Sequence, residues 1–401
     1  MKKAIIVLFI VFLTACNQET STLDEGFYRV VLGIQDNEEL PFVMNVNNPF
    51  SLEIYNADEV IQVDEIRYSN DSVFIQTPVF EGYIAAKITN SGFEGSFIKE
   101  SLDRIVPVKA KKNNEVRFEI KSDQKPTNMS GVWETVFSPD SNTDRYIAKG
   151  IFEQIGHQLT GTFRTTTGDY RYLEGVVDGD SFRLSTFDGA HAFLFTGKVN
   201  DSTLTGNFYS GDHWKEPFVA KRNPKYQLPD EHDLTYIKEG YDSFNFSFPD
   251  KEGNLVSLKD ERFQNKVVVV QIMGTWCPNC LDESKYYTQY AKEHSEVQFV
   301  SLAFEVAKTK EKAFQRIDRL KERLQIPYPI LLAQYGSDSK LLANEKLPML
   351  NHVLSYPTSI FIDKKGKVRK IHTGFNGPAT GQKYIDFKNE FESFIDLLLK
   401  E

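Results

Sequence analysis

The first half of the chain alternates apolar and polar residues over short segments. Between residues 26 and 222 this alternation is clear at 159–163, 181–184 and 204–208, and Gly, Asn and Asp residues separate such segments. A period of two is typical of a strand with one buried face, because successive side chains point to opposite sides of a sheet. Residues 26–222 contain no convincing helical pattern, so we expect an all-β region, either an antiparallel sandwich or an open barrel.

Two parts of this β region have residues in a similar order. Segment 72–97 contains Ser-Val-Phe-Ile, Phe-Glu-Gly, Lys-Ile and Phe-Glu-Gly-Ser-Phe, whereas segment 181–208 contains Ser-Phe-Arg-Leu, Phe-Asp-Gly, Lys-Val and Leu-Thr-Gly-Asn-Phe. A duplication would explain the similarity, but so would any two meanders of strands and turns. If it is a duplication, the region consists of two similar subdomains divided near residues 124–127.

The pattern changes in the second half of the chain. Residues 223–240 contain two prolines and many charges, which favours a linker. The continuous apolar run at 266–272 is typical of a strand buried on both faces. Further strands alternate with amphipathic helices, which predicts an α/β domain over residues 241–401. The expected strands are 297–304, 329–332, 359–363 and 367–371, and the expected helices run from the CxxC motif to about His294, through Phe314 to Leu324, and through Phe387 to Leu398.

The start of the chain has the composition of a secretory signal. Two lysines precede a short apolar run, and small residues follow it. The run is shorter than the roughly 20 apolar residues that a bilayer-spanning helix needs. The sequence Leu-Thr-Ala-Cys at 13–16 resembles the lipobox of bacterial lipoproteins, in which the cysteine is acylated and becomes the mature N-terminus. We therefore expect a signal peptide over residues 1–15, a lipid on Cys16 and a polar tether over residues 16–25.

The cysteines and the charge limit the chemistry further. Besides Cys16, the sequence contains only Cys277 and Cys280. A zinc site built on CxxC usually has two more Cys or His ligands. The chain has no second CxxC and its seven histidines are scattered, so we expect no metal. An oxidising compartment permits disulfides, which predicts a redox-active pair. The formal net charge of −9 argues against nucleic acid as a partner.

The order of motifs in residues 241–401 resembles the thioredoxin fold, and in particular the TlpA/ResA-like thiol–disulfide oxidoreductases of the bacterial envelope. The shared features are Phe-Pro at 248–249 before a turn, Gly-Thr-Trp-Cys-Pro-Asn-Cys at 274–280, and Tyr-Pro-Thr at 356–358 before a strand. Each motif alone is moderately specific, and their order is more specific. The resemblance implies an enzyme that exchanges disulfides through the Cys277–Cys280 pair, with no other cofactor.

The CxxC motif is expected at the start of a helix, where unpaired N–H groups and the helix dipole favour a negative charge. This position favours the thiolate of Cys277, which is the form that attacks disulfides. Cys280, one turn later, can then attack the mixed disulfide and release the partner. Pro278 suits the first helical position, because its missing N–H would be unpaired there.

The resemblance assigns further residues to the substrate-binding surface beside Pro278. Trp276 would screen one side of the sulfur, and the alternative is an ordinary core tryptophan. Tyr356 and Pro357 precede a strand, and Pro357 matches the position of a cis-proline that faces the CxxC motif. The backbone beside such a proline can pair with a bound substrate strand.

Two positions depart from the thioredoxin pattern. Thioredoxins carry a buried aspartate six residues before the first cysteine, and here Gln271 stands there. The ResA-like branch has a glutamate three residues after the second cysteine, which is Glu283 here. We expect Glu283 to relay protons to and from Cys280, and the alternative is a solvated helix glutamate. Lys285 replaces a proline that kinks the helix in many relatives, so the helix geometry there stays open.

The leading functional prediction is a membrane-anchored reductase of disulfides in other envelope proteins. Its expected partners are cysteine-containing envelope proteins, a membrane thiol reductase as electron donor, and the lipid bilayer through Cys16, on the periplasmic side. A thiol peroxidase is an alternative, but that chemistry needs Thr or Ser and Pro where the chain has Gly274 and Val270. The third alternative is a binding protein whose β region docks a partner. The sequence leaves the redox direction open.

Overall fold

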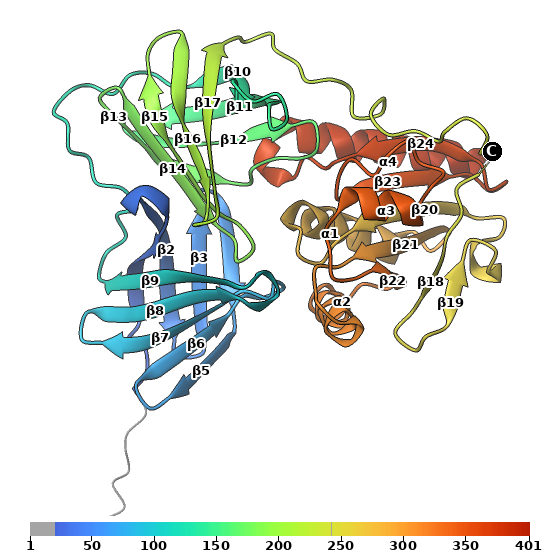
Figure 1. The fold of residues 1–401 in the computed structure, drawn as a ribbon, viewed down its shortest axis with the longest axis horizontal. Coiled ribbons are helices and arrows are strands. Elements are labelled where there is room, and N and C mark those ends of the chain that lie inside the picture. The colour runs from blue at the N-terminus through green and yellow to red at the C-terminus, as the bar shows by residue number, and fades with distance from the viewer. Residues whose placement is uncertain (1–20, 242) are drawn as a thin grey trace, which may run out of the picture.

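The computed structural model describes residues 21–241 and 243–401, which form three units that meet at a common centre (Figure 1). We call them the sheet unit (residues 26–112), the barrel unit (131–222) and the α/β unit (231–401). The predicted signal peptide and Cys16 lie outside the described residues. Among the described helices, none is long and apolar enough to cross a bilayer.

The sheet unit is one antiparallel sheet of nine strands. The strands are β1 (Gly26–Gly33), β2 (Glu39–Asn48), β3 (Ser51–Asn56), β4 (Glu59–Val63), β5 (Glu65–Ser69), β6 (Ser72–Gln76), β7 (Tyr83–Thr89), β8 (Gly92–Lys99) and β9 (Arg104–Lys112). Their order in the sheet is β4-β3-β2-β1-β9-β8-β7-β6-β5, so the first and last strands pair and the sheet stays open between β4 and β5. Alternate residues of β3 are buried, as the period of two predicts.

The barrel unit is a closed antiparallel barrel of eight strands. The strands are β10 (Gly131–Phe137), β11 (Tyr146–Ile155), β12 (Gln158–Thr165), β13 (Leu173–Asp178), β14 (Ser181–Phe187), β15 (Ala192–Val199), β16 (Thr203–Ser210) and β17 (Trp214–Arg222). Pairing of β10 with β17 closes it. The sequence predicted a sandwich or an open barrel, because periodicity shows which face of a strand is buried and not which strands pair. Side chains such as Trp133 fill the interior, as expected for a barrel of this size.

The two similar sequence segments occupy equivalent places in the two β units. Segment 72–97 covers β6, β7 and most of β8, and segment 181–208 covers β14, β15 and most of β16. Each set forms the three strands that precede the last strand of its unit. Residues 113–130 connect the units and include the predicted division near 124–127. Two meanders would match in this way with or without a duplication, so the duplication stays a prediction.

The α/β unit has a five-stranded mixed sheet in the order β22-β21-β20-β23-β24, with a separate hairpin of β18 and β19. Strand β20 is buried throughout and runs parallel to β21, as the continuous apolar run predicts. The strands are β18 (Ser247–Pro249), β19 (Leu255–Ser257), β20 (Val267–Met273), β21 (Val297–Phe304), β22 (Ile330–Gln334), β23 (Thr358–Ile362) and β24 (Val368–Thr373). The helices are α1 (Pro278–Glu293), α2 (Lys310–Leu324), α3 (Lys340–Lys346) and α4 (Gln382–Lys400).

The predicted linker over residues 223–240 belongs in part to the α/β unit. The N–H of Thr373 donates to the carbonyl of Glu231 at 3.1 Å, and the N–H of Lys238 donates to the carbonyl of Met349 at 2.8 Å. Ile237 and Leu350 also form an isolated β-bridge. Prolines and charges in the sequence gave no sign of this pairing, because the partners lie more than a hundred residues further along the chain.

Helix α2 joins the α/β unit to the open edge of the sheet unit. Three arginines of α2 pair with carboxylates at or near the ends of strands β4 to β7. Arg323 Nη2 lies 2.8 Å from Asp64 Oδ1, and Arg319 Nη2 lies 2.9 Å from Glu65 Oε1. Arg316 pairs with Glu81, which lies between β6 and β7. The sheet unit is therefore docked onto α2 through the ends of strands β4 to β7.

Candidate functional site

The CxxC motif begins α1, as predicted. Cys277 is the residue that caps the helix N-terminus, and its sulfur accepts a hydrogen bond from the backbone N–H of Cys280 at 3.3 Å. Pro278 occupies the first helical position. The two sulfurs are not bonded to each other, so the structure describes the dithiol form. Cys277 is 7% exposed and Cys280 is 0% exposed, so Cys277 is the sulfur nearer to solvent.

The segment around Pro357 faces this helix start. The peptide bond between Tyr356 and Pro357 is cis, as predicted. The carbonyl of Tyr356 accepts a hydrogen bond from the Cys277 thiol at 3.4 Å. Trp276 is partly exposed, donates from Nε1 to the carbonyl of Phe304 at 2.9 Å, and makes an edge contact with the Tyr356 ring. These contacts bring together the residues that the sequence assigned to the substrate-binding surface.

Cys280 and Glu283 lie in the interior below Cys277. Burial raises the pKa of the Cys280 thiol well above its ordinary value, and the hydrogen bond and negative charge of Cys277 act in the same direction. Glu283 is 0% exposed. The alternative of a solvated helix glutamate is therefore wrong, whereas the role of Glu283 as a proton relay stays a prediction.

Three side chains donate hydrogen bonds to the buried Glu283 carboxylate. Gln271 Nε2 donates at 2.9 Å, Ser359 Oγ at 3.0 Å and Tyr287 Oη at 3.2 Å. Burial raises the pKa of Glu283 to about 7, although these donors act against the shift. Gln271 Nε2 also lies 3.5 Å from the Cys280 carbonyl. Glu283 can therefore hold or release a proton close to Cys280 near neutral pH.

A second buried carboxylate, Glu305, was missed by the sequence analysis. Its two oxygens accept from the N–H of Thr275 at 2.8 Å and from Thr275 Oγ1 at 2.6 Å. Burial raises its pKa, and the bonds from Thr275 oppose that rise. Glu305 therefore fixes the turn that leads into Trp276 and Cys277. Its position directly after a buried strand was the sequence signal that could have identified it.

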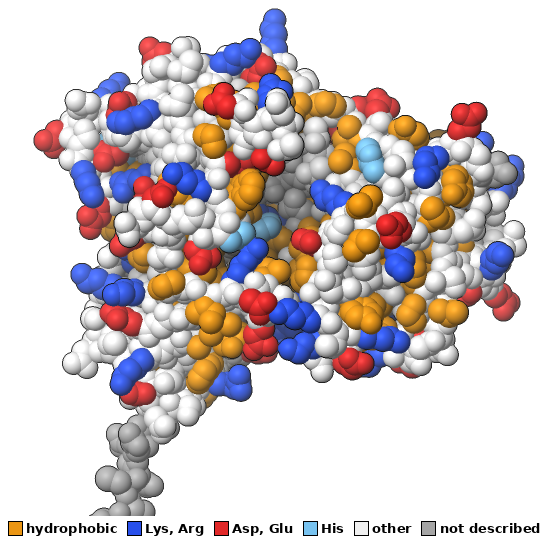
Figure 2. All heavy atoms as spheres, in the orientation of Figure 1, with side chains coloured by type: hydrophobic (Ala, Val, Ile, Leu, Met, Phe, Trp, Pro, Cys, Tyr) orange, Lys and Arg blue, Asp and Glu red, His pale blue; other side chains and the backbone are white. Residues whose placement is uncertain are grey.

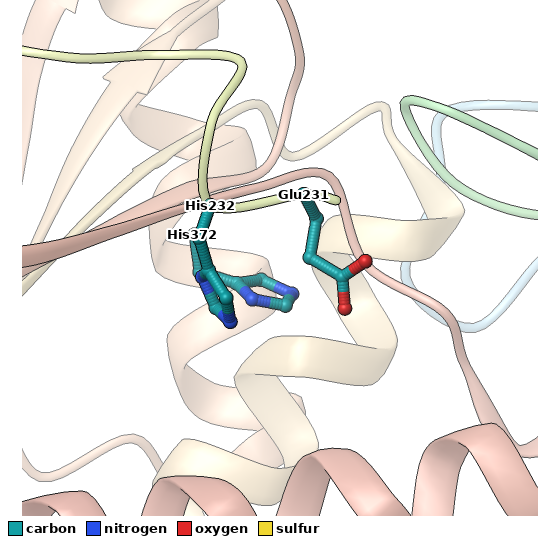
Figure 3. Close-up of side chains that lie close together, drawn as sticks. All are labelled: Glu231, His232 and His372. Atoms are coloured by element: carbon teal, nitrogen blue, oxygen red, sulfur yellow. The ribbon is translucent and has the colours of Figure 1, made fainter. Parts of the chain in front are cut away.

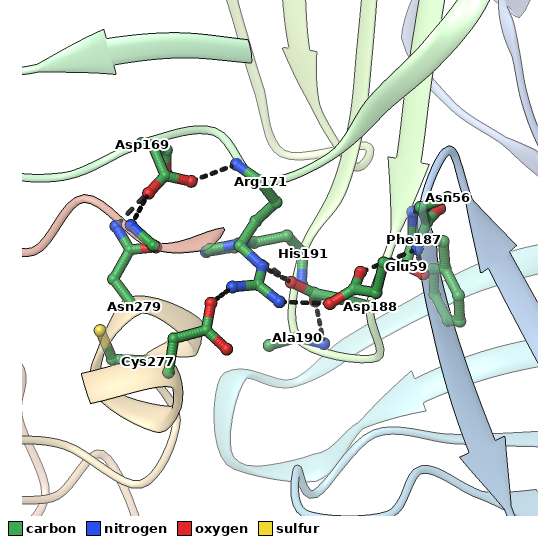
Figure 4. Close-up of polar contacts among 12 residues, drawn as sticks. Asn56, Glu59, Asp169, Arg171, Phe187, Asp188, Ala190, His191, Cys277 and Asn279 are labelled. Carbon is green, nitrogen blue, oxygen red and sulfur yellow. Dashed lines mark hydrogen bonds and ion pairs between the residues drawn. The ribbon is translucent and has the colours of Figure 1, made fainter. Parts of the chain in front are cut away.

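A loop of the barrel unit also reaches the CxxC motif. Arg171 lies between Glu59, Asp188 and the start of α1, and Asn279 contacts Asp169 (Figure 4). Asn279 Nδ2, between the two cysteines, donates to the carbonyl of Asp169 at 3.3 Å. The sequence gave no indication of this contact, because it depends on how two units pack.

Glu231, His232 and His372 lie close together where the segment after the barrel unit meets β24 (Figure 3). One ligand atom of each lies within 4.8 Å of the others. Oε1 of Glu231 pairs with Lys383 Nζ at 2.5 Å, and burial lowers the pKa of His372 to about 3, so its ring is neutral near pH 7. The sequence analysis treated the histidines as scattered. Because Lys383 already holds the carboxylate, we interpret the group as an anchor between this segment and α4.

Comparisons with known proteins match this part of the chain. The Redoxin family model matches residues 238–384. The chain is 31% identical over 144 residues to the thiol-disulfide oxidoreductase ResA of Geobacillus thermodenitrificans, covering 35% of this chain and 72% of that protein. It is 27% identical over 139 residues to the thioredoxin-like protein YneN of Bacillus subtilis, covering 34% and 73%. A solved thiol-disulfide oxidoreductase from Bacteroides fragilis superposes with a TM-score of 0.27 at 18% identity, covering 37% and 99%.

The substitution Glu283→Gln should change how stability depends on pH. The pKa of Glu283 is about 7 in the folded dithiol protein and 4.5 as its ordinary value. The folded state therefore binds a proton more tightly, and wild-type stability falls as pH rises from 4.5 through 7. One pKa unit corresponds to about 1.4 kcal/mol, so the ionised carboxylate costs roughly 3 kcal/mol above this range.

Chemical denaturation of both proteins at pH 5 and pH 8 measures this effect. When the pH is raised from 5 to 8, the free energy of unfolding of the Glu283→Gln variant should rise by roughly 2–3 kcal/mol relative to that of wild type. If the free energies of unfolding of the two proteins differ by the same amount at both pH values, that difference reflects only the altered hydrogen bonds. Parallel pH dependences in the two proteins would show that Glu283 does not titrate in this range.

Proposed function

The chain belongs to the TlpA/ResA-like thiol–disulfide oxidoreductases, and from this membership we propose that it is a lipid-anchored reductase that acts on disulfides of other envelope proteins. Thiol–disulfide exchange at the CxxC pair follows from the family, and cysteine-containing proteins are its substrates. The direction of transfer, the compartment and the anchor are our proposal. The burial of Cys280 beside a proton acceptor supports the direction most strongly.

The exchange proceeds in two steps that the geometry accommodates. The Cys277 thiolate attacks one sulfur of the substrate disulfide, and the other substrate sulfur leaves as a thiolate. Cys280 then loses its proton and attacks the Cys277 sulfur, which releases the second substrate thiolate and leaves a Cys277–Cys280 disulfide. Two electrons pass from the dithiol to the substrate. An external dithiol, for which we propose a membrane thiol reductase, must restore the reduced pair.

Glu283 is the group that we assign to the proton of Cys280. The Cys280 thiol is buried and its pKa is raised, so it needs a base inside the protein in the second step. Glu283 is buried nearby with a pKa of about 7, which suits both acceptance and release of a proton near neutrality. When the pair is reduced again, the same carboxyl group can return the proton.

The environment of the dithiol supports a reductant. Strong oxidants of this chemistry have a stabilised reduced form, in which a thiolate is favoured. Here burial disfavours the thiolate of Cys280, so only Cys277 at the helix start can contribute that stabilisation. The pair should therefore give up its electrons readily.

The reduction potential tests this direction. We expect a value near that of thioredoxin, about −270 mV, from equilibration with a glutathione or dithiothreitol buffer. The Cys277→Ser variant serves as the blank. A value near the strongly oxidising end, about −120 mV, would reverse the proposed direction.

Cys277 should be the sulfur that attacks substrates. The Cys280→Ser variant cannot resolve the mixed disulfide, so it should accumulate disulfide-linked complexes with partner proteins in cells. The Cys277→Ser variant should accumulate few, because Cys280 is fully buried. Non-reducing electrophoresis followed by mass spectrometry measures this, and the trapped proteins should come from the envelope. The opposite pattern would exchange the roles of the two cysteines.

Lipid at Cys16 should hold the mature protein at the membrane. The Cys16→Ser variant should appear in the soluble envelope fraction, whereas the wild-type chain should remain with membranes and carry lipid mass on its first residue. Two or more acyl chains give stable anchoring, which one chain does not. Membrane retention of the serine variant without any lipid would exclude this anchor.

A further inference from the structure

The loop between β12 and β13 closes one side of the site around Cys277. We call residues 166–171 the barrel loop. Asn279 Nδ2 donates to the carbonyl of Asp169 at 3.3 Å, and Ser355 Oγ donates to the carbonyl of Thr167 at 2.9 Å. Asn279 lies between the two cysteines and Ser355 directly precedes Tyr356. The barrel loop therefore touches both segments that face the reactive sulfur.

The contact is too close to be a chance apposition of surfaces. Gly168 forms a β-bridge with Phe375, and it has a φ of +151°, where side chains are rarely accommodated. A Cβ on Gly168 would lie 2.1 Å from Asn279 Nδ2. On the opposite side, a Cβ on Gly374 would lie 2.6 Å from the backbone of Thr167. Glycine on both sides allows the two backbones to meet, so the barrel loop is fitted to the α/β unit.

Arg171 fixes the base of the barrel loop by pairing with a carboxylate from each of the three units. Its guanidinium lies 2.5 Å from Glu59 of the sheet unit and 3.4 Å from Asp188 of the barrel unit (Figure 4). It also pairs with Asp282 of α1. Arg171 is 2% exposed. Burial alone would lower the pKa of Arg171. The negative charges of Glu59, Asp188 and Asp169 have the larger combined effect, so the pKa is raised. The guanidinium therefore stays charged and holds the barrel loop in place.

Other buried polar groups are matched across the same contact. Asp169 Oδ2 accepts from the N–H of Gly377 at 2.6 Å, and Arg164 Nε donates to Asn376 Oδ1 at 2.9 Å. All four residues are buried or nearly so. Opening the barrel loop would leave several of these groups without partners, which is costly in the interior. The loop is therefore a permanent part of the site.

The opposite side of Cys277 is less enclosed. Trp276 is partly exposed, and Lys340, which begins α3 and is close enough to Cys277 to interact with its charge, is exposed. The space-filling view shows a hollow where the units meet (Figure 2). A partner can approach the sulfur from the side of Trp276 and Lys340, but the barrel loop blocks a broad surface from lying flat across it.

We propose that the barrel loop, locked by Arg171, is a fixed wall that restricts the enzyme to disulfides carried on protruding or unfolded segments. This inference rests on the proposed reduction of protein disulfides and adds the substrate class. Arg171 is a positioning residue, since it acts through the barrel loop and does not touch the reacting sulfurs.

The first test measures access to Cys277 and needs no redox partner. The reduced full chain is treated with N-ethylmaleimide or with a maleimide that carries a long polyethylene glycol chain, and mass spectrometry quantifies modification at Cys277. For each thiol, the rate with N-ethylmaleimide is divided by the rate with the polyethylene glycol maleimide. In wild type this ratio should be at least about fivefold higher for Cys277 than for free glutathione. Arg171→Met should bring the ratio close to that of glutathione. If wild type gave the same ratio as glutathione, the barrel loop would not restrict access to Cys277 and the proposal would be wrong.

Arg323→Met is the matched control. Arg323 also joins two units, through Asp64 and Glu65, but at the far end of α2. The Arg323→Met variant should keep the wild-type ratio of modification rates. If the ratio falls as far as it does in Arg171→Met, the effect comes from any weakening of contacts between units and not from the barrel loop. If Arg171→Met does not fold, Gly374→Ala provides the same test, because its Cβ would lie 2.6 Å from the Thr167 backbone and would force the barrel loop away.

The second test measures substrate choice. A compact protein with one accessible disulfide is compared with the unfolded peptide that contains the same disulfide. Wild type should prefer the peptide in kcat/KM, Arg171→Met should lose most of this preference through faster reaction with the folded protein, and Arg323→Met should retain it. An unchanged preference in Arg171→Met, with Cys277 shown to be more accessible, would refute the proposed substrate class while leaving reductase activity in place.

Discussion

The arrangement of the molecule depends on the buried guanidinium of Arg171. Carboxylates from all three units surround it, and none of them would be stable in the interior without a positive partner. Removing one member of such a buried group typically costs about 3–5 kcal/mol, because the remaining charges lose their partners. The guanidinium therefore links the three units at one point beside the start of α1, in addition to the apolar core that the sheet and barrel units share through Phe187 and Leu194.

The ion group formed by Arg171 and its carboxylate partners Glu59, Asp188 and Asp282 lies against the helix that carries the CxxC motif. Helix α1 carries Cys277 at its cap and Asp282 five residues later, so the helix that presents the proposed nucleophile also carries one of the carboxylates that pair with Arg171. Glu305 fixes the turn before Cys277 from the other side. The reactive sulfur therefore lies between two fixed points. Disulfide exchange requires a defined line of approach between sulfurs, and a fixed helix start provides it.

The sequence predicted what depends on local pattern. Strand β21 was expected at 297–304 and is found there, because a mainly apolar segment of this length, rich in Val and Phe, favours a buried strand in an α/β domain. Pro357 and Glu283 were found by motif position. Helix α3 was missed because seven residues give too short a pattern. The partners of Arg171 and the closure of the barrel could not be predicted, since both depend on contacts between segments that are distant in sequence.

The division between the units separates two properties that a single small domain must combine. The proton transfer that we propose involves Glu283 and Cys280, which lie with Gln271 in the core of the α/β unit, so it does not depend directly on contacts with the β units. Access to Cys277 is set in part by the barrel unit through the contact at Asn279. Substitutions in the barrel loop can therefore alter which disulfides reach the sulfur without changing the residues that perform the exchange. In this proposal the barrel unit adds control of access to a chain whose chemistry lies within its last two fifths.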